Sequence, residues 1–293
     1  MSLTELEIEI QAGQLEAFEE RLFALGAVSV ELFDAGDEPL FEPPPGTHPL
    51  WSAIRLRAIF ADSLLAEIAG AALKTSEPAE TAARITTIAD QDWVRAGLAG
   101  LTRIHCGGKL WIVPSWEPLP DVDAGVFVHL DPGLAFGTGT HPTTAMCLAT
   151  LAETPPQTQQ VLDFGCGSGI LAIAALKLGA ASALGVDIDP QALQATRANA
   201  ERNGIHSDRL ETALPDVEPP TASFDLILAN ILAGPLVTLV PTLARSARPG
   251  ARLLLAGLLD WQADTVMAAY EDDFDIRIGM QRDGWVLLDG RRR

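Results

Sequence analysis

Residues 161–169 read Val-Leu-Asp-Phe-Gly-Cys-Gly-Ser-Gly, an apolar run that leads into three alternating glycines. The apolar run is typical of a buried strand, and the residues after it predict a tight turn into a helix. Glycine at these three positions lets the backbone turn sharply and approach a ligand without a Cβ in the way. The stretch therefore indicates the first strand, turn and helix of a nucleoside-binding βαβ unit.

A second apolar run ends at Asp187, 22 residues beyond Gly165. In a parallel sheet this carboxylate would lie at the end of the neighbouring strand, within reach of a ribose diol. It could accept charge-assisted hydrogen bonds from both hydroxyl groups. The alternative is that Asp187 or Asp189 only caps the next helix. Asp189 suits that capping role better, because Pro190 follows it.

The glycine spacing indicates which nucleoside is bound. A dinucleotide site of the Gly-x-Gly-x-x-Gly type would need a glycine at position 170, where the chain has Ile170. The motif present is Asp-x-Gly-x-Gly-x-Gly, opened by Asp163, and it resembles the first motif of class I S-adenosylmethionine (SAM) methyltransferases. A nicotinamide or flavin nucleotide, and a turn that binds no ligand, are the alternatives.

Hydrophobic periodicity divides the 293 residues into two predicted domains and a connecting region. Residues 1–92 follow the order β-α-β-β-α-β, which is that of a ferredoxin-like module. Residues 93–130 form the connecting region, in which Leu110–Val113 and Val126–Leu130 are expected to pair as strands. Residues 131–293 alternate between helix and strand, with a single helix over Leu236–Ala247. They predict an α/β, Rossmann-like doubly wound sheet with a terminal antiparallel strand.

Composition favours a cytoplasmic globular protein. No apolar run approaches the length of a membrane span, and the acidic start lacks the basic residues of a signal peptide. The three cysteines are odd in number and are not at metal-ligand spacing. These features predict reduced thiols, no metal site and no membrane contact.

The net charge of −19 argues against a broad nucleic-acid footprint, which would need clustered basic residues. Residues 1–92 carry 17 acidic against 5 basic side chains, so they hold most of the excess acid. That excess is either a solvated surface or a docking surface for a basic partner.

Other polar residues cluster near the expected strand ends. Asn230 follows a fully apolar run and would emerge at the carboxyl end of a central strand, facing the ligand crevice, unless it only caps the next helix. Thr143 and Thr144 begin a predicted helix, where their hydroxyls could bond a carboxylate. His141, before a proline, is interpreted as a turn residue rather than a base. Cys166 is not expected to act as a nucleophile, because direct methyl transfer from a sulfonium needs none.

Four segments together resemble the ribosomal protein L11 methyltransferases, the PrmA family. They are Leu130–Thr144, Val161–Pro190, Asn199–Gly204 and Ala229–Pro235. The most specific stretches are Phe-Gly-Thr-Gly-Thr-His-Pro-Thr-Thr at 136–144 and Ala-Asn-Ile-Leu-Ala-Gly-Pro-Leu at 229–236. Residues 92–101 depart from the family's usual acidic and aromatic pattern.

The resemblance implies a ferredoxin-like recognition domain joined to a SAM-dependent methyltransferase domain. The implied activity is methylation of the α-amino group and lysine side chains of the large-subunit ribosomal protein L11, with SAM as methyl donor. It places SAM contacts on Thr144, Gly165, Asp187 and Asn230, with Gly167 in the same loop. Asn230 is the residue expected to orient the amine. We expect a monomer that binds no specific nucleic acid.

Three other functions are less consistent with the sequence. A methyltransferase of RNA or of a small metabolite is disfavoured, because Ile231-Leu232 replaces the aromatic shelf on which a flipped base would stack. A non-catalytic SAM-binding protein is disfavoured by the presence of the glycine loop, Asp187 and Asn230 together. A nucleotide-dependent dehydrogenase is opposed by Ile170.

Overall fold

The computed structural model describes residues 3–36, 38, 49–74, 83–88, 102–122, 124–131, 139–217 and 219–293. Its contacts divide the chain into two compact units, Met1–Ala99 and Gly100–Arg293. The predicted domain boundaries at 92 and 130 stay a prediction. The departure from the family pattern at 92–101 lies outside the described residues.

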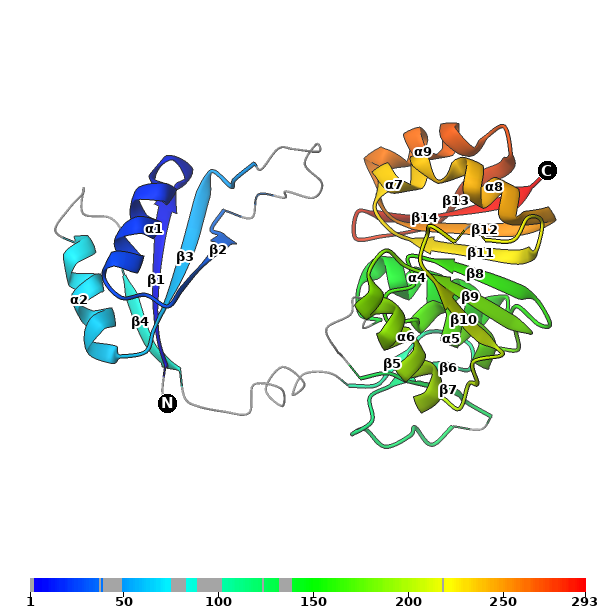
Figure 1. Cartoon of the computed structure of the whole chain (residues 1–293), viewed down its shortest axis with the longest axis horizontal. Helices are drawn as coiled ribbons and strands as arrows, with labels where there is room; N and C mark the ends of the chain where they lie inside the picture. The colour runs from blue at the N-terminus through cyan, green and yellow to red at the C-terminus, as the bar shows by residue number, and fades with distance from the viewer. Residues whose placement is uncertain are drawn as a thin grey trace. The chain divides into compact units, whose positions relative to one another are not determined.

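The first unit is a four-stranded antiparallel sheet with two helices (Figure 1). Its elements are β1 (Leu3–Gln11), η1 (Ala12–Gln14), α1 (Leu15–Ala24), β2 (Ser29–Asp34), β3 (Ala53–Phe60), α2 (Ser63–Lys74) and β4 (Arg84–Ile88). The sheet order is β2-β3-β1-β4. Alternate residues Leu6, Ile8 and Ile10 of β1 are buried in a core of the unit's own. The element order is the one predicted, and the ferredoxin-like assignment stays a prediction.

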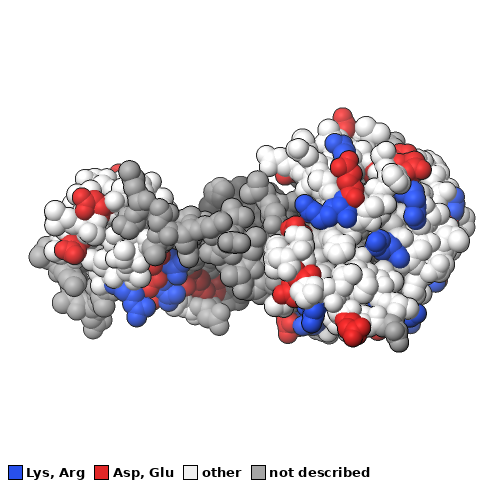
Figure 2. Space-filling view, turned by 90° about the horizontal axis from the view of Figure 1, so that it is seen from below, with Lys and Arg blue, Asp and Glu red and all other residues white. Residues whose placement is uncertain are grey.

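The other face of this sheet carries paired charges. Glu7 and Glu9 of β1 lie opposite Arg57 and Arg55 of β3, with N–O distances of 3.2 and 3.1 Å. Figure 2 shows acidic and basic side chains side by side on the first unit. On this face the acidic side chains of β1 are therefore paired with the arginines of β3.

The second unit begins with a small sheet of β5 (Ile104–His105), β6 (Leu110–Val113) and β7 (Val126–His129). The predicted pairing of β6 with β7 is present, and the two strands run parallel. Leu110, Ile112 and Val128 are buried in the core that also contains helix α5. Strands β6 and β7 therefore pack against the core of the second unit.

A seven-stranded sheet forms the body of the second unit (Figure 1). Its elements are α4 (Pro142–Glu153), β8 (Gln160–Phe164), α5 (Ile170–Lys177), β9 (Ser182–Val186), α6 (Pro190–Arg202), β10 (Leu210–Ala213), β11 (Phe224–Asn230), α7 (Ala233–Thr238), α8 (Val240–Ser246), β12 (Ala247–Leu259), η2 (Asp260–Gln262), α9 (Ala263–Tyr270), β13 (Phe274–Arg282) and β14 (Trp285–Arg292). Helices α4, α5 and α6 cover one face, and α7, α8 and α9 cover the other.

One predicted helix is two helices in the structure. Residues 236–247 contribute to α7 and α8, which meet at Leu239. Pro241 explains the break, because a proline has no N–H to donate to the preceding turn but is tolerated in the first turn of a new helix.

The strand order is β10-β9-β8-β11-β12-β14-β13, the doubly wound sheet that the sequence predicted. β14 is the antiparallel strand, and it lies between β12 and β13. From β8 the chain winds outward through β9 and β10, and then returns to β11 on the other side of β8. In doubly wound sheets ligands bind at such a reversal, outside the carboxyl ends of the strands, which here are those of β8 and β11.

Candidate active site

The glycine loop leaves β8 at the carboxyl edge of the sheet. Gly165, Gly167 and Gly169 all have positive φ, of 81, 54 and 77°. A Cβ at Gly165 would collide with the Ile231 side chain, and one at Gly169 would lie 2.8 Å from Cγ2 of Thr196. The loop therefore needs glycine at 165 and 169 both for its backbone conformation and for its close packing against the loop after β11 and against α6.

Asp187 is bonded to this loop. Its Oδ2 accepts the Gly167 N–H at 2.8 Å, and its Oδ1 accepts the Asp189 N–H at 3.0 Å. Asp189 is the N-cap of α6 and accepts the Gln191 N–H at 2.8 Å. Asp187 is thus not the helix cap, and its half-buried carboxylate lies against the glycine loop.

Helix α6 holds the glycine loop in place through Thr196 and Asn199, two residues for which the sequence predicts no role. The Thr196 hydroxyl donates to the Gly167 carbonyl at 3.0 Å, and Asn199 Nδ2 donates to the Ser168 carbonyl at 2.8 Å. Both side chains are buried and lie three residues apart on one helix face. Two polar residues at that spacing on an otherwise apolar helix face are the sequence signal that could have indicated this role.

Asn230 and Thr144 meet although 86 residues separate them. Asn230 Nδ2 donates to Thr144 Oγ1 at 3.1 Å. The N-cap of α7 is Leu232, so Asn230 does not cap that helix. Because Ile231 packs directly on Gly165, this pair stands beside the loop that contacts Asp187. The five residues predicted to bind the cofactor therefore come from four loops or helix starts at one sheet edge.

His141 has a structural position at the start of α4. It is the N-cap, and its Nδ1 lies 2.8 Å from Thr143 Oγ1 and 3.4 Å from the Thr143 nitrogen. Its ring also packs edge-on against Trp285, with ring centroids 4.9 Å apart. These contacts agree with a turn and capping role.

Cys166 is a buried thiol within the loop. Burial, followed by the nearby Asp163, raises the pKa of Cys166 to about 12. A thiol that stays protonated at neutral pH is a poor nucleophile. This agrees with the prediction that Cys166 takes no covalent part.

Asp163 is a buried carboxyl beneath the loop, and the sequence predicts no role for its side chain beyond opening the glycine motif. It is 1% exposed, and its Oδ2 accepts the Ala172 N–H at 3.0 Å in the first turn of α5. Burial raises the pKa of Asp163 from 3.8 to about 7; the Ala172 bond lowers it and the neighbouring Asp187 raises it further. Asp163 therefore titrates near neutrality.

This titration predicts a pH-dependent stability. Between pH 3.8 and about 7 the folded protein keeps the Asp163 proton that the unfolded chain has lost. The free energy of unfolding should therefore fall as pH rises through this window, by on the order of a few kcal/mol. Asp163→Asn keeps an acceptor for Ala172 and cannot ionise. Urea unfolding of both proteins from pH 4.5 to 7.5 should show the variant gaining stability relative to the wild type, and parallel profiles would contradict the assignment.

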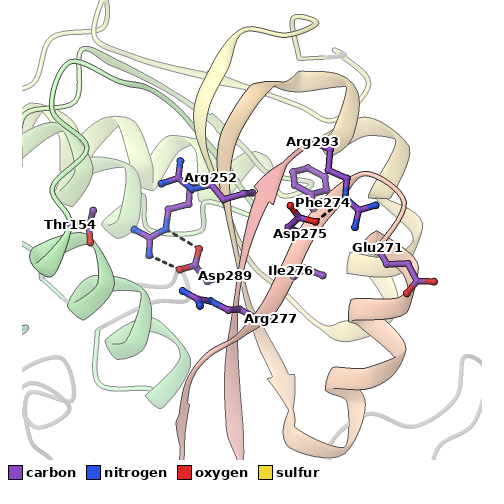
Figure 3. Close-up of a pocket in the computed structure, with 10 residues that line it drawn as sticks. Thr154, Arg252, Glu271, Phe274, Asp275, Ile276, Arg277, Asp289 and Arg293 are labelled. Carbon is purple, nitrogen blue, oxygen red and sulfur yellow. Dashed lines mark hydrogen bonds and ion pairs between the residues drawn. The ribbon is translucent and has the colours of Figure 1, made fainter.

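A cavity of about 650 Å³ lies elsewhere, at the amino end of β12 and β13 (Figure 3). Arg252 and Asp289 on its wall form a two-pronged ion pair, with N–O distances of 3.0 and 2.8 Å. None of the predicted site residues lines this cavity. It is at the sheet edge opposite the glycine loop and takes no part in the candidate site.

The described residues contain no group of three or more His, Cys, Asp or Glu side chains placed to hold a metal ion. Within the same residues, no helix is long and apolar enough to cross a membrane.

Comparison with known proteins indicates the family to which the chain is related. The family described as "Ribosomal protein L11 methyltransferase (PrmA)" matches residues 2–293. Ribosomal protein L11 methyltransferases of Azotobacter vinelandii and Pseudomonas aeruginosa are 51% and 50% identical, over all of this chain and 100% and 99% of theirs. The crystal structure of ribosomal protein L11 methylase from Lactobacillus delbrueckii subsp. bulgaricus is similar with a TM-score of 0.58 and 36% identity, over 66% of this chain and 100% of that one.

Proposed function

Because the chain belongs to the ribosomal protein L11 methyltransferase (PrmA) family, we propose that it methylates amino groups of ribosomal protein L11, namely the α-amine and lysine side chains. Its methyl donor is SAM. The observation that carries the proposal is the Asn230–Thr144 pair beside the glycine loop and Asp187. This arrangement joins a nucleoside-binding edge to an amide that can orient an amine.

Each site residue has a proposed task toward the donor. The Asp187 carboxylate suits the two ribose hydroxyls, and the backbone at Gly165 and Gly167 allows close approach. The Thr144 hydroxyl at the start of α4 suits the carboxylate of the methionine part. When bound, SAM supplies an electrophilic methyl group on a sulfonium.

The remaining task is to present a neutral amine in line with that methyl group. Asn230 can accept a hydrogen bond from the amine through its side-chain oxygen, while its Nδ2 is held by Thr144. A lysine side chain has an ordinary pKa near 10.4 and an α-amine one near 8, so the amine must lose a proton before it reacts. Water can take that proton. His141 is engaged in capping α4, which supports no further role as a base.

We further propose that the protein acts as a cytoplasmic monomer without specific nucleic-acid recognition. All three cysteines are free and buried thiols, as in a reducing compartment. Ile231 and Leu232 follow Asn230 where a base-binding site would need an aromatic shelf. Figure 2 shows basic side chains interspersed with acidic ones on the visible face of the second unit, unlike a continuous basic footprint.

The proposal is tested directly with radiolabelled SAM and purified L11. Incubation with the enzyme, followed by mass spectrometry of L11 peptides, should show methyl groups on the N-terminal amine and on lysines. A parallel incubation with total ribosomal RNA should leave the RNA unlabelled. Methylation of L11 only on side chains other than amines would overturn the proposed specificity.

Asp187 provides a separate test of the cofactor site. We expect Asp187→Ala to weaken SAM binding by about 1.5–3 kcal/mol, because a charge-assisted contact to two hydroxyls is lost. Calorimetric titration measures this dissociation constant. The matched control is Asp189→Ala, which removes the α6 cap and should lower stability by about 1 kcal/mol while SAM affinity is retained. An unchanged dissociation constant in Asp187→Ala would remove Asp187 from the site.

A further inference from the structure

The loops at the carboxyl edge of the large sheet fall into two groups. Those after β8, β9 and β10 carry the glycine loop and Asp187 and form the cofactor half. Those after β11 and β12, together with the turn before β14, form a second half that begins at Asn230. Each half exposes large apolar side chains. On the second half these are Leu232, 50% exposed, and Trp261, 68% exposed.

Leu232 and Trp261 stand on loops that are tied together. The Ile231 N–H donates to the Ala256 carbonyl at 3.1 Å, and Gly257, with φ of 88°, packs against the Ile231 backbone. The Asp260 N–H donates to the Gly284 carbonyl at 3.0 Å, which fixes the Trp261 turn on the β13–β14 turn. Gly284 precedes Trp285, whose ring contacts His141. The exposed tryptophan is therefore on a fixed turn, on the side of Asn230 away from Asp187.

The net charge beside Trp261 is negative, because Arg282 at the end of β13 is paired with Asp283 at an N–O distance of 3.4 Å. Asp260 is exposed, and its Oδ1 accepts the backbone N–H of Trp261 at 2.7 Å. The carboxylate and the indole therefore belong to adjacent residues of one turn. Asp264 is exposed one turn further on, in α9. An exposed indole beside carboxylates suits a cationic partner, through cation–π contact and charge pairing. Large exposed aromatic side chains are also the residue type that most often dominates binding energy at protein interfaces.

We propose that Leu232, Asp260 and Trp261 form an acceptor-side surface that binds the basic segment of the protein substrate flanking the amine to be methylated. The inference rests on the proposed function, and it adds where the second unit holds its substrate. Leu232 follows Asn230 by two residues in the chain, so it lies on the loop that leaves β11 at Asn230. A bound lysine or arginine next to the reacting amine would keep that amine at the crevice while SAM occupies the other half.

The test is steady-state methylation of L11 by full-length variants. Trp261→Ala should raise KM for L11 at least about tenfold, with kcat at saturating L11 and the calorimetric dissociation constant of SAM both within about twofold of wild type. Asp260→Asn should raise KM for L11 less than Trp261→Ala does. In this variant KM should also increase less steeply with salt concentration than in the wild type. Leu232→Ser should keep the fold, because serine is a favoured N-cap residue for α7. It should also raise KM.

Matched controls lie away from the carboxyl edge. Ile278→Ala, on β13, and Asp272→Asn, in the turn before β13, remove an exposed apolar and an exposed acidic side chain and should leave KM unchanged. An unchanged KM in all three surface variants would overturn the proposal. A loss of SAM affinity in step with KM would also overturn it, by assigning the surface to the cofactor site. If the wild-type enzyme methylates no amine of L11, the proposed function itself is wrong. The wild-type reaction therefore distinguishes a failure of the proposed function from a failure of the surface proposal.

Discussion

A chain that begins at Gly100 should bind SAM as tightly as the full-length protein but methylate L11 about 10²–10⁴-fold less efficiently. Residues of the first unit include none of the predicted SAM contacts, and the unit has a hydrophobic core of its own. Its proposed task is to hold the protein substrate, which raises the effective concentration of the amine at the second unit. Without it, kcat/KM should collapse while the cofactor site stays intact.

The measurements are calorimetric titration with SAM and initial rates with L11. Retained SAM affinity shows that the shortened chain is folded, so a slow rate can be attributed to substrate delivery. As a control, a short peptide that carries one reactive amine should be methylated equally slowly by both chains. If the shortened chain methylates L11 as fast as the full chain does, the first unit has no recognition role and its excess acid is a solubility feature.

Asn230→Ala should lower turnover by about 10²–10³-fold and weaken SAM binding less than tenfold. The Asn230 side chain is held by Thr144 at the point where the amine must be oriented. A displacement of the nucleophile by about 1 Å can lower the rate by about 10²-fold. Single-turnover rates at saturating SAM and L11 separate this effect from binding.

Asn203→Ala is the matched amide control. Asn203 lies at the C-terminal end of α6 and bonds the His129 backbone, so its loss should reduce stability but not the turnover of folded enzyme. Parallel losses of turnover and SAM affinity in Asn230→Ala would make Asn230 a cofactor contact alone. Near-wild-type values for both would exclude it from the site.

The parts of the site with strong local signals were predictable from the sequence. The apolar run before Gly165 and the position of Asp187 each follow from strand periodicity and from the short connections of parallel sheets. The split at Leu239 was also encoded locally, by Pro241, but the apolar pattern on both sides of the proline favoured one continuous helix.

The tertiary pairings were not predictable in the same way. The bond between Thr144 and Asn230 depends on how α4 lies across the sheet, and no local pattern reports that placement. The parallel pairing of β6 and β7, and the burial of Leu110, Ile112 and Val128 in the core that contains α5, depend likewise on packing. The raised pKa of Asp163 arises only once the loop and helix α5 enclose it.

The conformation of the glycine loop is held by hydrogen bonds within the protein itself. Gly165 and Cys166 donate to the Val186 carbonyl at 2.7 and 3.0 Å, Gly167 donates to Asp187, and α6 donates two more bonds from behind. The conformational entropy of ordering this segment is thus lost during folding and not when SAM binds. Amide protons at 165–167 should therefore exchange slowly with solvent in the free protein. The association rate of SAM should be set by diffusion and not by ordering of the glycine loop.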